Sequence, residues 1–255
     1  MEVLTREQKE RYARQIVLKG VGEEGQMRLL KGRVLVIGAG GLGSPASMYL
    51  AAAGVGTLGI ADADKVDVSN LQRQIAHGTE DVGTPKTESA RQTINKMNPD
   101  VTVHAYEMFV NEENIMELLK NYDFVIDATD NFTSKFLIND ACVKAGKSFC
   151  HAGILGFQGQ IMTYVPGKGP CYRCIFQNPP GDEVPDCKQT GVIGAAAGVI
   201  GSLQAMEALK YLLGAGELLT GTLLTYDALR MEFRTVKLPG YVPNCPVCGK
   251  AGTYS

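Results

Sequence analysis

The chain has 255 residues, with 25 Lys or Arg and 27 Asp or Glu, so its formal net charge is -2. This length allows one large α/β domain with a sizeable core and disfavours two equal domains. The balanced charge predicts no general affinity for nucleic acid or for an anionic membrane, so any anion site has to be local. The start, MEVLTREQKERYARQ, lacks the apolar core of a secretory signal, which favours a cytoplasmic protein.

Residues 1–30 are predicted to form an N-terminal helical arm. Thr5 and Gln8 have the spacing of a capping box, in which each side chain bonds the backbone N–H of the other residue. A helix that begins there is expected to continue through Tyr12 and Arg14.

The stretch RVLVIGAGGLGS at residues 33–44 predicts a strand, a tight turn and the start of a helix. Gly38, Gly40 and Gly43 have the G-x-G-x-x-G spacing of loops that bring the backbone close to a polyphosphate. The third glycine lets helix and strand pack closely, and free N–H groups at the helix start face the anion. The motif alone leaves open a purely structural turn.

Strands and helices alternate from residue 33 to about residue 152, a pattern typical of a parallel sheet with helical crossovers. The predicted strands are 33–38, 57–62, 101–106, 123–129 and 148–153, and the predicted helices are 45–54, 86–98, 111–120 and 131–146. The fold class is therefore α/β, with a Rossmann-like, mostly parallel sheet over residues 31–152.

Residues 153–255 are predicted to extend one edge of the sheet with antiparallel strands, and residues 177–191 have the Pro, Gly and Asp content of a crossover loop. The apolar segment 191–214 contains Gln204, Glu207 and Lys210. We therefore expect a buried helix there and no membrane span. The whole chain, 1–255, is predicted to be a single domain.

Four of the seven cysteines form two C-x-x-C pairs, Cys171 with Cys174 and Cys245 with Cys248. Four thiolates can close a tetrahedral shell around Zn²⁺, which predicts a structural zinc clip. A redox dithiol or unliganded thiols remain alternatives. Cys187 lies beside a lysine in the crossover loop, where it is either an exposed, reactive thiol or an incidental surface residue.

Polar residues after the glycine loop indicate nucleotide chemistry. Asp62 is about 20 residues beyond the loop and suits the ribose of either NAD or ATP. Two cations, Arg73 and Lys86, provide more positive charge than a diphosphate requires. They suit a triphosphate from which pyrophosphate leaves. Asp130 follows a strand at the carboxyl edge of the sheet, where a carboxylate can hold Mg²⁺. Surface positions for the two cations and a helix N-cap for Asp130 remain alternatives.

Eight motifs occur in order along the chain: RYARQ (11–15), GAGGLGS (38–44), DADKVDVSNLQRQ (62–74), GTPKTESA (83–90), DATDN (127–131), CYRC (171–174), GVIGSLQAMEALK (198–210) and CPVCG (245–249). With them the chain resembles the ubiquitin-activating-like adenylyltransferases over essentially its whole length. The most similar members are the bacterial molybdopterin-synthase and thiazole-biosynthesis adenylyltransferases.

This resemblance implies an enzyme that uses ATP and Mg²⁺ to adenylylate the C-terminal Gly-Gly carboxylate of a small ubiquitin-like sulfur-carrier protein. Pyrophosphate is released, and the carrier is prepared for thiocarboxylate formation in molybdopterin, thiamine or related biosynthesis. A sulfurtransferase is implied as a possible donor of the sulfur.

The family pattern also assigns residues to this reaction. Gly41 belongs to the phosphate loop, Asp62 to the ribose and Asp130 to the metal. Asn70, Arg73 and Lys86 bind the phosphates. The nucleotide-binding set is completed by Gly38, Gly40, Gly43, Ser69, Leu71, Gln72 and Asn131.

Three further positions depend on the resemblance alone. Arg14 matches an arginine that reaches the triphosphate of the neighbouring subunit, which implies a homodimer with composite sites. Cys187 matches a loop cysteine and is a candidate for sulfur transfer. Lys135 stands where relatives often have arginine, which puts any bidentate contact there in doubt.

Two other functions were compared with this one. An NAD-dependent oxidoreductase accounts for the glycine loop and Asp62, but it leaves Arg73, Lys86 and the cysteine pairs without a role. A noncatalytic, zinc-stabilised docking protein for the carrier does not need charged residues that converge on an anion loop.

Overall fold

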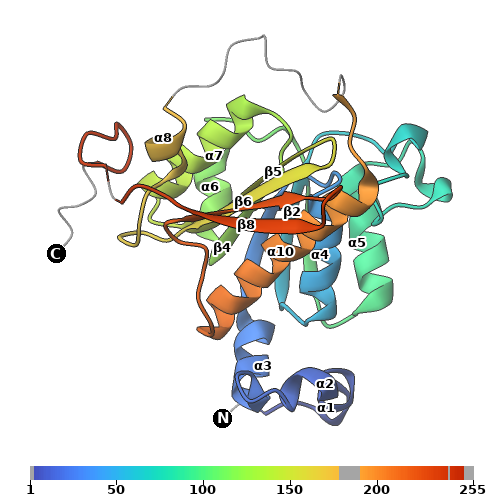
Figure 1. Cartoon of the computed structure of the whole chain (residues 1–255). Coiled ribbons are helices and arrows are strands. Elements are labelled where there is room, and N and C mark those ends of the chain that lie inside the picture. Colours follow the sequence, from blue (N-terminus) through green and yellow to red (C-terminus); the bar gives the residue numbers. More distant parts are fainter. Residues whose placement is uncertain (1–2, 178–189, 241, 250–255) are drawn as a thin grey trace.

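The computed structural model describes residues 3–177, 190–240 and 242–249 (Figure 1). Among these residues, eight strands form one sheet in the order β3-β2-β1-β4-β5-β6-β7-β8. The predicted α/β class is confirmed, including the antiparallel extension at one edge.

The parallel half of the sheet is built around two buried central strands. β1 (Arg33–Ile37) pairs with β2 (Thr57–Asp62) on one side and with β4 (Phe124–Asp127) on the other. β3 (Thr102–Glu107) and β5 (Ser148–Leu155) lie outside them, and all neighbouring pairs run parallel. The carboxyl ends of these strands therefore meet at one edge of the sheet, where sites in open α/β folds are built.

Alternation along β1 explains why helices cover both faces. Val34 and Val36 belong to one apolar cluster, with residues of α4 (Gly43–Ala52), α5 (Lys86–Met97) and α10 (Gly194–Leu213). Leu35 and Ile37 belong to the other cluster, with residues of α6 (Ile115–Lys120), α7 (Phe132–Lys144) and α8 (Tyr172–Ile175). Successive side chains of a strand point to opposite faces, so a strand buried on both faces is apolar throughout.

The antiparallel half consists of β6 (Gln158–Tyr164), β7 (Thr222–Asp227) and β8 (Glu232–Lys237). β6 pairs with β5, and each later strand pairs with the one before it. The apolar helix α10 packs against α4, β5 and β6, as predicted for a buried helix. Within the described ranges, no helix combines the length and apolar character that a bilayer crossing requires.

The N-terminal arm contains α1 (Arg6–Arg11), α2 (Ala13–Ile16) and α3 (Gly22–Lys31). The predicted capping box of Thr5 and Gln8 is confirmed. The predicted continuous helix is instead broken at Tyr12, whose buried hydroxyl accepts a hydrogen bond from Asn98 Nδ2 at 2.9 Å. This contact holds the arm at the end of the sheet opposite to the carboxyl edge, because Asn98 caps the C-terminus of α5.

Candidate active site

A cavity of about 1470 Å³ lies along the carboxyl edge of the sheet. The ends of β1, β2 and β4 form one part of its wall, and residues of β5, β6 and β7 form the other. Eleven of the residues predicted from the sequence line it: Gly38, Gly40, Gly41, Asp62, Ser69, Asn70, Gln72, Arg73, Lys86, Asp130 and Asn131. Residues that are distant in sequence are thus brought to one cleft. Leu71 and Gly43 are not among the residues that line it.

Two glycines of the loop have different structural roles. Gly38 has a φ of 97°, and a Cβ atom there would lie 2.7 Å from the carbonyl oxygen of Ala128. A Cβ atom on Gly43 would lie 1.8 Å from the carbonyl oxygen of Gly38. Gly43 therefore allows the first turn of α4 to approach the loop, while Gly38 allows the loop to approach the end of β4.

Asp62 is fixed at the end of β2 by two backbone donors. Its Oδ2 accepts a hydrogen bond from the N–H of Ala39 at 2.7 Å, and its Oδ1 accepts one from the N–H of Asp64 at 2.8 Å. Each carboxylate oxygen can accept a further hydrogen bond. The loop and this carboxylate are thus joined into one rigid edge of the cleft, with acceptor capacity left for hydroxyl groups.

The segment after Asp62 presents Arg73 to the loop. The short helix η1 (Val68–Asn70) begins at Asp67, which accepts hydrogen bonds from the N–H and the hydroxyl of Ser69. The Arg73 guanidinium donates to the carbonyl oxygen of Ser69 at 3.0 Å. Its side-chain Cδ lies 3.3 Å from the position of a Cβ atom on Gly41. The cation therefore lies directly beside the glycine loop.

Lys86 is a buried cation with a carboxylate partner. Only 6 % of the residue is exposed, and its Nζ lies 2.8 Å from Oδ2 of Asp64. The alternative of a solvated surface position is therefore wrong for Lys86. The sequence analysis also missed Asp64, although its place two residues after Asp62 was a signal for a second acidic group at the same strand end.

Asp130 and Asn131 separate into two roles at the start of α7. Asn131 is the N-cap, and its Oδ1 accepts a hydrogen bond from the N–H of Ser134 at 2.8 Å. The alternative that Asp130 is the N-cap is therefore wrong. Asp130 is exposed and lines the cleft. A carboxylate in such a position suits Mg²⁺, which binds proteins through one or two carboxylates together with substrate phosphates.

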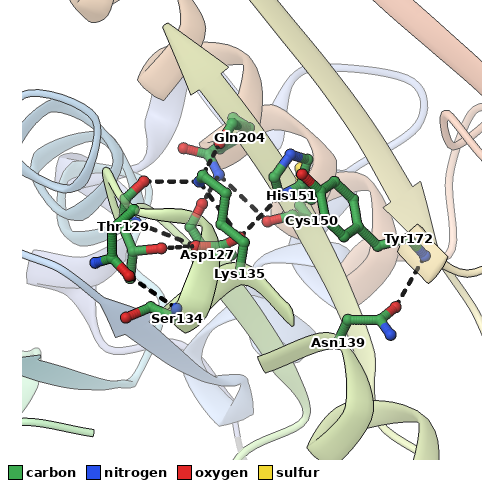
Figure 2. Close-up of polar contacts among 11 residues, drawn as sticks. Asp127, Thr129, Ser134, Lys135, Asn139, Cys150, His151, Tyr172 and Gln204 are labelled. Carbon is green, nitrogen blue, oxygen red and sulfur yellow. Dashed lines mark hydrogen bonds and ion pairs between the residues drawn. The ribbon is translucent and has the colours of Figure 1, made fainter. Parts of the chain in front are cut away.

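A buried polar cluster lies behind this turn, and the sequence analysis missed it (Figure 2). Asp127 at the end of β4 accepts hydrogen bonds from Thr129 Oγ1 at 2.7 Å and from His151 Nδ1 at 2.8 Å. Lys135 Nζ lies 3.6 Å from Asp127 Oδ2 and donates to the carbonyl oxygens of Thr129 and Ala152, both at 2.7 Å. These contacts suit three donors on a compact ammonium.

Burial, neighbouring charges and hydrogen bonds determine the protonation states of Asp127 and His151. Burial alone would raise the pKa of Asp127, but the Lys135 charge and the hydrogen bonds from His151 and Thr129 lower it to about 2. Burial, and then the Lys135 charge, lower the pKa of His151. His151 is therefore neutral at pH 7 and carries its proton on Nδ1, because a carboxylate can only accept.

The four predicted zinc ligands come together where the segment after β8 meets α8. The Sγ atoms of Cys171, Cys174, Cys245 and Cys248 all lie within 4.8 Å of one another. Three of the pairs lie at 3.3, 3.6 and 3.9 Å. Zn–S bonds of about 2.3 Å set tetrahedral S–S edges of about 3.8 Å, so the cluster fits zinc in donor type and in size.

The thiols of this cluster differ in acidity. Burial and the neighbouring sulfur groups raise the pKa of Cys171. Burial also acts against ionisation of Cys245, but hydrogen bonds from the backbone of Cys248 and Val247 lower its pKa to about 7. Four thiolates at these distances need a cation between them, which is the condition that a metal provides.

Arg14 is exposed on α2 and is not among the residues that line the cavity. Cys187 lies outside the described residues. The remaining missed residues of the cleft include Asp227, Arg230, Glu232 and Arg234, which lie on or beside the β7–β8 hairpin. They lie in the part of the chain predicted to form antiparallel strands, and no motif marks them in the sequence.

Comparison with known proteins assigns this architecture to a family. A model of the ThiF family matches residues 12–247. The chain belongs to the ThiF family. This ThiF-family chain is 51% identical over 249 residues to the SAMP-activating enzyme E1 of Haloferax volcanii, covering 97% of this chain and 92% of that protein.

Two further sequence relatives support the assignment. The sulfur carrier protein adenylyltransferase of Thermus thermophilus is 48% identical over 255 residues, with 98% of the ThiF-family chain and 94% of that protein covered. The adenylyltransferase and sulfurtransferase MOCS3 of Dictyostelium discoideum is 47% identical, with 96% of this chain covered. The chain spans 58% of the length of that protein.

The same fold occurs in a solved structure of more distant sequence. Escherichia coli MccB superimposes with a TM-score of 0.84 at 24% identity, over 96% of this chain and 74% of that one. At this identity the likeness supports the fold only. The ThiF-family assignment itself rests on the sequence matches.

Proposed function

We propose that the protein is an ATP-dependent adenylyltransferase that activates the C-terminal carboxylate of a small, ubiquitin-like sulfur-carrier protein. The observation that carries the proposal is the convergence of Arg73, Lys86 and Asp130 on the glycine loop in one cleft. The printed names of the two relatives at 51% and 48% identity support the same reaction and substrate class.

The chemical step needs positioning and charge neutralisation and no protein nucleophile. An oxygen of the carrier's terminal carboxylate forms a bond to the α-phosphorus of ATP, and the bond to the β-phosphate oxygen breaks. Pyrophosphate leaves with that electron pair, and the product is an acyl-adenylate. Arg73 and Lys86 neutralise the charge that develops on the leaving group. Bound Mg²⁺ would polarise phosphate oxygens, with Asp130 as its protein ligand.

The cleft extends beyond the proposed nucleotide site. The proposed nucleotide half runs from Asp62 to Asp130, and the cavity continues past β5 to Gln158, Gln160 and Thr225. We assign this second half to the flexible tail of the carrier. Extended peptides are recognised by polar groups and side-chain pockets along strands, which β6 and β7 offer there.

The four-cysteine cluster is proposed to hold structural zinc. A closed shell of four thiolates leaves no open position on the metal, so the ion would stabilise the fold and take no part in the reaction. It would attach the segment after β8 to α8, which is itself held to α7 by Arg173. The Arg173 guanidinium donates to both oxygens of Asp140 at 2.7 and 2.8 Å.

A homodimer is the second part of the proposal. Arg14 lies on an arm at the end of the sheet opposite to the cleft, so the proposed contact with triphosphate requires a neighbouring subunit. An apolar surface on α4, α10 and the loop after η1 supports this arrangement: Tyr49, Ile75 and Met206 are 56%, 62% and 52% exposed. Exposed apolar groups that gather on one face are typical of an interface between proteins.

Subunit mixing tests the composite site. Arg14→Ala and Arg73→Ala are each expected to inactivate a homodimer, while a mixed dimer retains one site with both arginines. Random reassociation should therefore restore about one quarter of the wild-type activity, as for any two-fold dimer with shared sites. If no activity returned although mass spectrometry showed mixed dimers, Arg14 would have no role in the partner's site.

Carrier-dependent exchange of labelled pyrophosphate into ATP tests the reaction itself. We expect exchange with Mg²⁺ and one Gly-Gly-tailed carrier, and none with the same carrier shortened by its last glycine. The intact mass of the carrier should rise by one AMP. Binding of NAD without exchange for any carrier would instead support the oxidoreductase.

A further inference from the structure

The backbone of the Thr129–Asp130 turn is held from behind by buried groups. Asp127 Oδ1 accepts hydrogen bonds from both the N–H and the hydroxyl of Thr129, at 3.1 and 2.7 Å. Lys135 Nζ holds the carbonyl oxygen of the same residue at 2.7 Å. Every polar group of Thr129 is therefore bonded to this cluster, one residue before the proposed metal ligand Asp130.

Three elements supply the cluster, so it cannot be moved without disturbing the sheet. Asp127 ends β4, His151 lies on β5 and Lys135 lies on α7 (Figure 2). Asp127 and His151 are 0 % and 1 % exposed, and Lys135 is 6 % exposed. At such burial, hydrogen bonds to a charged group are strong and their loss is costly.

Gln204 adds a fourth contact from the other face of the sheet. Its Nε2 donates to the carbonyl oxygen of Asp127 at 2.7 Å and to that of Cys150 at 3.2 Å. Both strand ends below the turn are thus fixed by side chains from α7 and α10. Gly38 of the phosphate loop packs directly against Ala128, which precedes the turn.

We propose that Asp127, Lys135 and His151 are positioning residues, which fix the Thr129–Asp130 turn and thereby set the affinity of the Asp130 carboxylate for Mg²⁺. The inference rests on the proposed function. Thr129, Lys135 and His151 line the same cleft as Asp130, and we assign them a role in metal binding that is separate from any contact with the nucleotide base, ribose or phosphates. Groups that orient a metal ligand commonly affect metal affinity about 10- to 100-fold when they are removed.

The chain offers a matched pair of variants for the test. Thr129→Val removes the hydroxyl that donates to buried Asp127 at 2.7 Å. Thr163→Val removes a hydroxyl that donates to buried Glu207 at 2.6 Å, on β6 and away from the cleft. Both changes delete the same type of hydrogen bond at nearly constant side-chain volume. Only the first lies on the turn that carries Asp130.

The measurement is the binding of α,β-methylene-ATP, which has no cleavable bond at the α-phosphate. Calorimetry gives its dissociation constant once with Mg²⁺ and once in magnesium-free buffer without chelator, and the ratio of the second constant to the first reports the contribution of Mg²⁺. We expect Thr129→Val to reduce this ratio about tenfold and to leave binding in the magnesium-free buffer unchanged. Thr163→Val should leave the ratio at the wild-type value, and Thr129→Ser, which keeps the hydroxyl, should restore it.

Other outcomes overturn the inference. If Thr129→Val and Thr163→Val lowered the melting temperature alike and neither changed the ratio, the cluster would be purely structural. If Thr129→Val weakened binding equally with Mg²⁺ and in the magnesium-free buffer, Thr129 would act on the nucleotide directly. An analogue that failed to bind the wild-type protein in either buffer would count against the proposed function itself, which separates the two failures.

A variant of Lys135 tests the role of the cationic residue in the cluster. Lys135→Arg keeps the charge but replaces a compact ammonium with a planar fork. We expect the same ratio of dissociation constants to fall for this variant, while binding in the magnesium-free buffer and the folded state are retained. An unchanged ratio would contradict a role for Lys135 in fixing the turn.

Discussion

The two halves of the sheet edge offer a ligand different kinds of surface. In the parallel half, Lys86 is 6 % exposed and bonded to Asp64, and Arg73 is bonded to Ser69. On the β7–β8 hairpin, Leu229 and Met231 are each 73% exposed. A small charged substrate needs donors at fixed positions, whereas a protein partner needs accessible area. The proposed function therefore places the chemistry in the parallel half and carrier recognition in the antiparallel half.

The largest effect is expected in the parallel half, from Arg73→Ala. Loss of a preorganised cation at the leaving group should lower the pyrophosphate exchange rate by about 10²- to 10³-fold. The affinity for the carrier, measured by calorimetry, should stay the same. Arg91→Ala is the control, because Arg91 is bonded to Glu88 on α5 and does not line the cleft. If Arg73→Ala also lowered the affinity for the carrier, the proposed division of roles between the two halves of the sheet would be wrong.

The next effect is on stability, from removal of the proposed metal. Cys248→Ser, or a strong chelator, should lower the free energy of unfolding by about 3 kcal/mol, the contribution of a ligand present at some hundreds of times its dissociation constant. Cys142→Ser is not a suitable control because Cys142 is buried in the core. Wild-type protein with zinc resupplied after chelation serves instead. Zinc content by mass spectrometry and calorimetric unfolding are the measurements, and an unchanged melting curve after zinc loss would exclude the clip.

Low pH is expected to destabilise the parallel half of the sheet before the antiparallel half. The pKa of Asp127 is about 2 in the folded chain, below the ordinary value of about 3.9 for an unfolded Asp. Its contribution to stability is therefore present above pH 4 and is lost as the pH falls through 4 toward 2, on the order of 2 kcal/mol. Asp127→Asn should flatten the slope of stability against pH in this window.

Hydrogen exchange locates this acid effect. Amides of β4 and β5 should lose protection at a higher pH than amides of β7 and β8, because Asp127 and His151 link the first pair. Simultaneous loss in all four strands would show that the acid sensitivity belongs to the whole sheet.

The smallest effect is expected in the antiparallel half. Arg230 has a side chain that is 71% exposed and lines the cleft beside Asp227. Arg230→Glu should raise the KM for the carrier about tenfold through altered electrostatic complementarity, with the KM for ATP unchanged. Arg28→Glu, on the exposed surface of α3, is the charge-matched control. Equal changes in the two variants would mean that net charge alone matters.

The sequence predicted those features of the fold and the site that depend on local patterns. Glycine spacing and apolar runs located the loop at Gly38 and the parallel strands, because period and turn chemistry are local properties. The cysteine pairs predicted a cluster, because each pair fixes two ligands at once. The break at Tyr12 was missed, since it follows from a contact with Asn98, 86 positions away.

The rest of the candidate site arises only when separate elements meet. His151 falls within the predicted strand 148–153 and in none of the motifs, and Lys135 stands out in the sequence only as a departure from arginine. Their function with Asp127 depends on the pairing of β4 with β5 and on the packing of α7. Similarly, Asn131 and not Asp130 is the N-cap of α7. The two positions are one residue apart, and helix boundaries cannot be predicted from sequence to within one residue.

The cysteine cluster also has a topological consequence. Cys174 and Cys248 are 74 positions apart, so a metal held by both pairs closes a loop that contains all of α10, β7 and β8. A single peptide-bond cut anywhere inside that loop would leave two fragments joined through the ion as well as through the sheet. Cleaved protein should therefore migrate as one particle in native electrophoresis, and the proposed metal would make the last third of the chain tolerant of a break in its own backbone.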